Sequence, residues 1–188
     1  TNVRKALEGL PGDIRYRKKN SPGLKKLTQN YSNTDAQHEQ SKFFYQRVTG
    51  KIPNNVGNQE YISAYQNRHI VNGFYPTKHT TDVRARYARL AFGQQDQISK
   101  STRLDPEGYC PTLRAGTGPE KGSYQAVRPI HYNYARVITP REAARLQGFP
   151  DWYKLPDTIW HGFRQIGNSV SPIVAEQVLS AIYQKLIL

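Results

Sequence analysis

The sequence is poor in residues that cross-link or anchor a chain. Among its 188 residues there is one cysteine, Cys110, and no methionine. A single cysteine excludes an intramolecular disulfide and any metal cluster built from several cysteines. No run approaches the ~20 apolar residues of a membrane-spanning helix, and nothing at the N-terminus is typical of a signal peptide. The missing methionine indicates a chain that was trimmed after synthesis or cut from a longer one.

Histidine is the residue type best suited to metal binding or proton transfer, and it is sparse here. Four of the five histidines are His69, His79, His131 and His161. Their separations do not match the spacing of metal ligands. We therefore expect ordinary core or surface histidines and no bound metal.

Acidic residues are also scarce. The 27 lysines and arginines outnumber the 14 aspartates and glutamates, giving a formal net charge of +13 and a pI of about 9.9. Such an excess favours a polyanionic partner, nucleic acid before an acidic protein or a membrane surface. The basic stretch at residues 15–26 is predicted to be a solvated face. As a DNA contact it would hold backbone phosphates, because lysine clusters carry no base information.

Three segments combine helical spacing of apolar residues with capping signals. They are residues 2–9 after Asn2, residues 80–91 before Gly93, and residues 172–186 after the predicted cap Ser171. The remaining segments read as a loop at 28–41, short mixed elements at 42–75, and short strands and loops at 99–135, with 124–131 the most strand-like. Because helices and strands are scattered without βαβ alternation, the pattern predicts an α+β fold.

Residues 139–148 carry the clearest helix signal. Thr139 and Glu142 have the spacing of a capping box, in which each side chain bonds the backbone of the other. Gly148 is the expected stop. Arg141 and Arg145 lie four residues apart on one face, where we expect them to pair with acids or solvent rather than with phosphate.

Two runs near the C-terminus carry a family resemblance. Residues 136–151, RVITPREAARLQGFPD, resemble the ninth motif of the DNA cytosine-5 methyltransferases, and residues 165–175, QIGNSVSPIVA, are similar to the tenth. Weaker matches are residues 3–11, which look like the helix after the eighth motif, the stretch around His79, which resembles the start of the target recognition domain, and residues 101–114, which resemble its Thr-Leu element.

Other motifs of that family do not occur in the sequence. Neither the cofactor glycine motif, nor the Pro-Cys pair of the nucleophile, nor the Glu-Asn-Val acid motif is found. Cys110 precedes Pro111, in the reverse order, so it is not expected to be the nucleophile. We expect no catalytic residue in this chain and no methyl transfer by the chain alone.

The resemblance implies two groups of site residues. The Thr-Leu loop lies against the major groove, which suggests DNA contacts by Arg103, Thr112, Leu113, Arg114, Gly116 and Thr117. Arginine suits bidentate reading of guanine, although a glycine-rich turn with exposed arginines explains the same residues. The tenth motif reaches S-adenosylmethionine (AdoMet) through Asn168, Ser169 and Val170. A plain turn before a helix is the alternative there.

The implied protein is the DNA-recognition part of a DNA (cytosine-5-)-methyltransferase, of the kind found in bacterial restriction–modification systems in the cytoplasm near the nucleoid. Its expected parts are a connector helix (1–12), a target recognition domain of short strands and helices (13–165), and motif ten with a C-terminal helix (166–188). That helix would pack on a separate, Rossmann-like catalytic domain. The expected partners are double-stranded DNA and the catalytic half, which shares the AdoMet site.

The sequence leaves open where the catalytic half lies and whether the chain has a different function. The catalytic half is either a separate subunit of a split enzyme, which the starting point of the chain favours, or a domain that was cut away. A stand-alone DNA-binding regulator descended from the family would have the same charge, but it has no use for a cofactor loop. A basic protein-interaction domain is a more distant possibility.

Overall fold

The computed structural model describes residues 1–14, 23–28, 39–50, 52–115 and 128–187. The elements follow the order α1 (Val3–Leu7), β1 (Lys25–Lys26), α2 (Glu39–Thr49), α3 (Gln59–Arg68), β2 (Ile70–Val71), α4 (Thr81–Ala88), α5 (Pro140–Leu146), α6 (Ile159–Gly167) and α7 (Pro172–Leu186). Strands β1 and β2 pair antiparallel. In the described part of the chain, no helix is long and apolar enough to cross a membrane.

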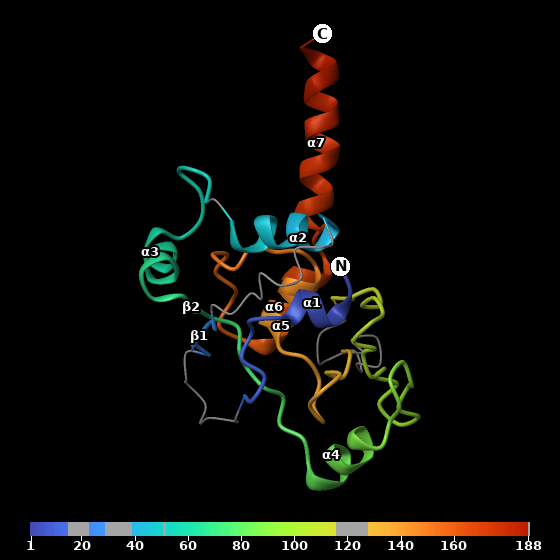
Figure 1. The fold of residues 1–188 in the computed structure, drawn as a ribbon. Coiled ribbons are helices and arrows are strands. Elements are labelled where there is room, and N and C mark those ends of the chain that lie inside the picture. The colour runs from blue at the N-terminus through green and yellow to red at the C-terminus, as the bar shows by residue number, and fades with distance from the viewer. Residues whose placement is uncertain (15–22, 29–38, 51, 116–127, 188) are drawn as a thin grey trace.

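Helix α5 lies at the centre of the body, packed against α1 and α6 (Figure 1). The predicted capping box is confirmed: Thr139 Oγ1 accepts from the Glu142 amide at 3.3 Å, and the Glu142 carboxylate accepts from the Thr139 amide at 2.6 Å. A Cβ at Gly162 of α6 would come within 2.9 Å of the Pro140 Cβ. Glycine at this position therefore lets α6 approach α5 closely.

The main hydrophobic cluster surrounds α5. It joins Val3 and Leu7 of α1 with Leu104, Ile138 and Phe163. The helix that was expected to be a connector thus shares its core with segments predicted to belong to the recognition domain. Smaller clusters lie beside the two-stranded sheet and under α4.

Two further predicted helices are confirmed, and some helices of the structure were not predicted as such. Helices at residues 80–91 and 172–186 are confirmed as α4 and α7, although α4 ends at Ala88. Ser171 is the N-cap residue of α7, as predicted, but its side chain makes no capping hydrogen bond. Helix α6 was not predicted, and α2 lies across the segments read as a loop and as mixed elements.

Several predicted segments fall partly outside the described residues, namely most of 15–26, most of 28–41, and 124–127 of the strand expected at 124–131. Within the described remainder of that strand, Ile130 forms isolated bridges with Arg103 and Val137.

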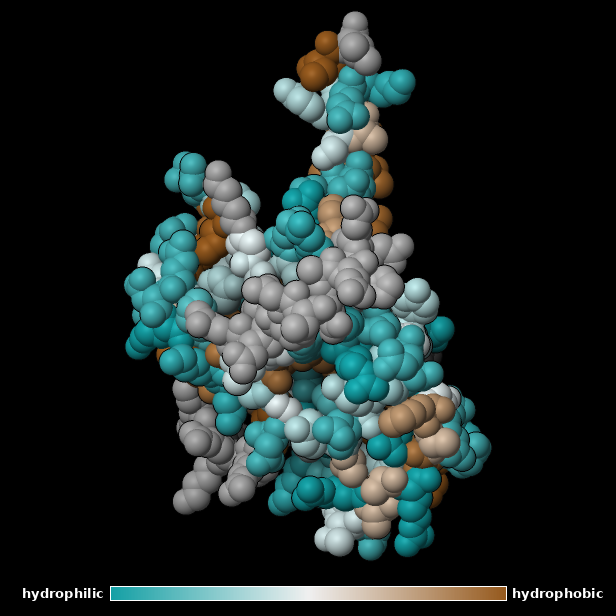
Figure 2. Space-filling view, viewed as in Figure 1, coloured by the Kyte–Doolittle hydropathy of each residue, from teal (hydrophilic) through white to brown (hydrophobic). Residues whose placement is uncertain are grey.

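Helix α7 projects away from the body, with its base beside α2 (Figure 1). None of its residues is buried. An ion pair of 2.9 Å between Arg47 and Glu176 and the packing of Ile173 against α2 hold its first turns. Large apolar side chains along the helix are nevertheless exposed: Val174, Val178, Leu179, Ile182, Tyr183 and Leu186. Figure 2 shows brown side chains along this projecting helix.

Candidate DNA interface and cofactor loop

The two arginines of α5 are fully buried. Arg145 donates hydrogen bonds to both carboxylate oxygens of Asp151, and the distance from Arg145 Nε to Asp151 Oδ1 is 3.0 Å. Arg141 donates to the backbone carbonyls of Asn72 and Tyr153 at 2.8 and 2.7 Å. The prediction of an acidic partner is therefore confirmed for Arg145, and it is wrong for Arg141, which binds carbonyl groups instead. Neither guanidinium reaches the surface, so neither is a phosphate contact.

Glu142 joins the start of α5 to the segment before it. Its carboxylate receives two hydrogen bonds from Arg136, at 2.8 and 2.7 Å. Burial alone would raise the pKa of Glu142, but the bonds and charge of Arg136 outweigh burial and lower it. The neighbouring His131 is buried, which lowers its pKa to about 4 despite the pull of Glu142 in the other direction. This histidine is therefore neutral near pH 7.

Arg103 is tied to the backbone of its own surroundings. Its guanidinium donates to the Tyr132 carbonyl at 2.7 and 3.1 Å and to the Leu90 carbonyl at 2.6 Å, and it lies 5.0 Å from the centre of the Phe92 ring. These bonds join the segment after α4 to the turn before α5. Contact of Arg103 with DNA stays a prediction, and it would require donors that now bind carbonyl groups.

The Thr-Leu element offers a different environment. Thr112 and Arg114 are exposed, and Leu113 packs against the main core. Gly116 and Thr117 lie outside the described residues. Cys110 is half-buried beside this loop, and burial raises the pKa of its thiol to about 12. A neutral thiol is a poor nucleophile, and the absence of chemistry at Cys110 stays a prediction.

A glycine contact joins this loop to the second predicted site. A Cβ at Gly167 would lie 2.2 Å from the Ala115 amide nitrogen and 2.5 Å from the Arg114 carbonyl carbon. Such distances are possible only without a side chain, and the atoms involved are backbone. The end of α6 and the Thr-Leu loop are therefore in direct contact, 52 residues apart in sequence from Ala115 to Gly167. Both loops were predicted from the sequence as site elements, but the contact between them was not.

The turn after α6 carries the three residues predicted to reach AdoMet. Asn168 caps the C-terminus of α6 and exposes its side chain. Ser169 Oγ donates to the Ile166 carbonyl at 2.7 Å, while the Ser169 carbonyl accepts from Gln147 at 3.3 Å. Val170 is 68% exposed. An exposed amide beside a hydroxyl with acceptor capacity fits the ammonium and carboxylate of a methionine moiety.

The described residues were also compared with the requirements of a metal site. In the ranges that the structure describes, no three His, Cys, Asp or Glu side chains are grouped so that they could hold a metal ion.

The fold of this chain is similar to part of a solved DNA methyltransferase structure. A crystal structure described as a DNA modification methyltransferase encoded within a prophage (E. coli) matches 99% of this chain with a TM-score of 0.81 and 46% identity. The match covers 47% of that longer protein.

A family model for C-5 cytosine-specific DNA methylases matches residues 4–184, so the chain belongs to that family. The type II methyltransferase M.XorII of Xanthomonas oryzae pv. oryzae is 45% identical over 120 residues, which are 62% of this chain and 28% of that protein. DNA (cytosine-5)-methyltransferase 1 of Gallus gallus is 41% identical over 76 residues, which are 40% of this chain and 5% of that protein. The chain spans well under half the length of these curated relatives.

Proposed function

We propose that this chain is the DNA-recognition part of a DNA (cytosine-5-)-methyltransferase and that it closes the AdoMet pocket of a catalytic half. The contact at Gly167 carries the proposal, because it joins the loop predicted to meet DNA to the loop predicted to meet the cofactor. A protein that positions a cytosine for methylation needs the DNA and the methyl donor held side by side. AdoMet supplies the methyl group when bound, and the residues of this chain hold and orient the DNA and the AdoMet.

Each loop has a defined part in this proposal. Thr112, Leu113 and Arg114, with Gly116 and Thr117 beyond them, contact the major groove of duplex DNA. Arg103 supports that surface by fixing the segment after α4. Asn168, Ser169 and Val170 meet the methionine end of AdoMet from one side, while the catalytic half forms the remainder of its pocket.

Helix α7 supports the existence of a second half. Its apolar side chains are exposed over most of its length, and monomeric proteins rarely leave such a surface uncovered. The prophage methyltransferase is about twice as long as the part that this chain matches. We propose that α7 packs on the catalytic half, whether that half is a separate subunit or belongs to one longer chain, and that the enzyme serves a restriction–modification system.

A complementation assay tests the proposal. The chain is mixed with a catalytic half that carries the glycine motif and the Pro-Cys pair, and transfer of labelled methyl groups to duplex DNA is measured with each half alone as control. Methyl transfer is expected in the mixture and in neither half by itself. Methylation by this chain alone would contradict its assignment as the recognition part.

The second candidate function is a DNA-binding regulator without catalysis, which the net charge of +13 favours equally. A mixture of the two halves that binds DNA but transfers no methyl group would support this function instead.

A further inference from the structure

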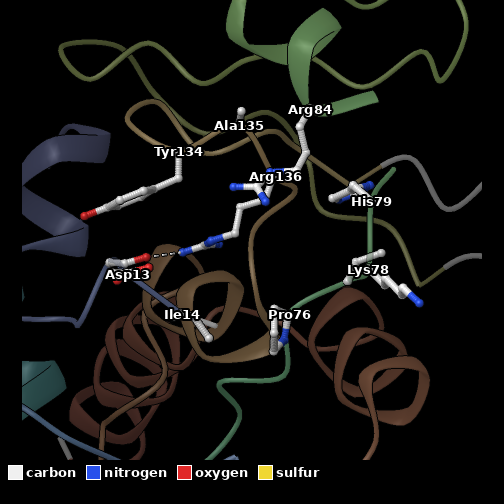
Figure 3. A pocket seen from close by; sticks show the side chains of 11 residues that line it. Asp13, Ile14, Pro76, Lys78, His79, Arg84, Tyr134, Ala135 and Arg136 are labelled. Carbon is white, nitrogen blue, oxygen red and sulfur yellow. Dashed lines mark hydrogen bonds between the residues drawn. The ribbon is translucent and has the colours of Figure 1, made fainter. Parts of the chain in front are cut away.

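A pocket of about 290 Å³ opens where three distant segments meet, and none of the residues predicted for DNA or cofactor lines it. The segments are residues 12–14 after α1, residues 76–79 before α4, and residues 134–136 before α5, and Arg84 of α4 completes the wall. Figure 3 shows Arg84 and Arg136 reaching into the same space from different elements.

Two guanidinium groups make this pocket electropositive. Arg136 is already bound by Glu142, and it also donates to the Gly12 carbonyl at 3.0 Å (dashed line in Figure 3). Arg84 is exposed, and its guanidinium forms no hydrogen bond or ion pair with any residue that the structure describes. Asp13 and Lys78 also line the pocket, and both interact with other groups of the protein. The cation available for a ligand is therefore Arg84.

Two neutral donors accompany that cation. The hydroxyl oxygen of Thr77 is buried and has no hydrogen-bond partner among the described residues. His79 accepts a hydrogen bond from the Val137 amide through Nε2, at 3.3 Å. Burial, followed by the charges of Arg84 and Arg136, lowers the pKa of His79. The neutral ring that results must carry its proton on Nδ1, which leaves Nδ1 as a donor.

We propose that this pocket binds one phosphate group of the DNA backbone through Arg84, Thr77 and His79. The proposal rests on the proposed function, since it takes DNA as the source of the phosphate. A phosphate oxygen would give the Thr77 hydroxyl the acceptor that it lacks, and its charge would offset the two guanidinium groups. Three segments meet at this point, so the contact would orient the recognition loops on the duplex without reading sequence.

Salt dependence of DNA binding tests the charge contact. Binding of the 188-residue chain to a short duplex is measured from 0.05 to 0.3 M salt for the unchanged chain, Arg84→Gln and Arg89→Gln. The control removes the same charge from an exposed residue at the end of the same helix, outside the pocket. Arg84→Gln should reduce the salt slope by about 0.9 and weaken binding roughly five- to tenfold at 0.1 M salt, as expected for one lost phosphate contact.

The outcomes separate the pocket from the function as a whole. Equal effects of Arg84→Gln and Arg89→Gln would show a general charge effect and would overturn the pocket, while the DNA-binding function would stand. Absence of any duplex binding by the unchanged chain at low salt would overturn both. A shift of the His79 ring resonances by inorganic phosphate, together with an unaltered DNA slope in Arg84→Gln, would identify a free-phosphate site and refute a backbone contact.

Thr77→Val provides an independent check with effects of opposite sign. Valine has the same shape and removes a buried hydroxyl that has no partner, so the unfolding free energy should stay the same or rise. DNA affinity should nevertheless fall about two- to fivefold, because one hydrogen bond to phosphate is lost. Unchanged affinity in this variant would remove Thr77 from the site.

Discussion

Helices α5 and α7 both begin with a proline in the first turn, yet their surroundings are opposite. Six of the seven residues of α5 are buried, whereas none of the fifteen residues of α7 is. The chain itself supplies the capping box, ion pairs and core around α5. Isolated helices of this length are marginal in water, which supports the proposal that α7 packs on the catalytic half. Contacts within the described residues thus account for the stability of α5 but not for that of α7.

The largest expected effect concerns α7. The double variant Val178→Glu, Ile182→Glu places two charges on its exposed apolar face, one turn apart. Burial of each side chain contributes about 1.5–3 kcal/mol, so association with the catalytic half should weaken by roughly 3–6 kcal/mol, and methylation in the mixture should disappear. Titration calorimetry of the two halves measures the loss. The unfolding free energy of the isolated chain should change by under ~0.5 kcal/mol.

A matched control adds the same charge elsewhere on α7, as Gln177→Glu, Gln184→Glu. Association should then be nearly unchanged. Equal loss of association in both double variants would mean that charge, and not the apolar face, governs docking.

The buried ion pair of α5 should show the next largest effect, this time on stability. Asp151→Asn leaves the Arg145 guanidinium buried without its counter-charge, which typically costs about 3–5 kcal/mol. Urea unfolding measures the change. Glu176→Gln, which breaks the exposed pair with Arg47, is the control and should cost under ~1 kcal/mol. If the two losses were similar, burial would not be what distinguishes the two pairs.

Local signals in the sequence were sufficient for much of the fold. The capping box at Thr139 and the apolar spacing of residues 172–186 depend only on neighbours within a few turns, and both helices are confirmed. Helix α6 escaped prediction because Gly162, usually a helix-weakening residue, is required there by the close approach of Pro140.

The sequence predicted the two loops of the candidate site but not the contact between them. Resemblance named both loops, but the contact of Gly167 with Ala115 is a tertiary fact that no local pattern encodes. The burial of Arg141 among carbonyl groups is of the same kind, since its partner Asn72 lies 69 residues away. Arg103 was predicted as a DNA contact because arginine can bind guanine. In the structure its guanidinium instead donates to the backbone carbonyls of Tyr132 and Leu90.

The glycine contact gives the third prediction. Gly167→Ala forces a methyl group into backbone atoms of Arg114 and Ala115, and overpacking of this kind costs about 1–3 kcal/mol. If the contact joins the two sites, DNA and AdoMet affinities of the assembled enzyme should both fall, by roughly 5- to 150-fold in their product. Gly93→Ala, where an added methyl meets no atom within 4 Å and only the positive φ of 75° adds strain, should lower stability and leave both affinities unchanged. Loss of one affinity alone would show that the loops work independently.

The smallest effect is a pH dependence of stability that arises beside α5, at His131, whose ring lies 3.6 Å from the Glu142 carboxylate. Burial lowers the pKa of His131 to about 4, against about 6.5 in an unfolded chain. The unfolded state therefore takes up the proton first, and stability is lost as pH falls from 6.5 toward 4. Between pH 7.5 and 5.5 the loss should be roughly 1 kcal/mol. Urea unfolding at both values should show it, and His131→Gln should reduce the difference between them. An equal pH dependence in that variant would assign the effect to other groups, among them His79, whose lowered pKa acts with the same sign.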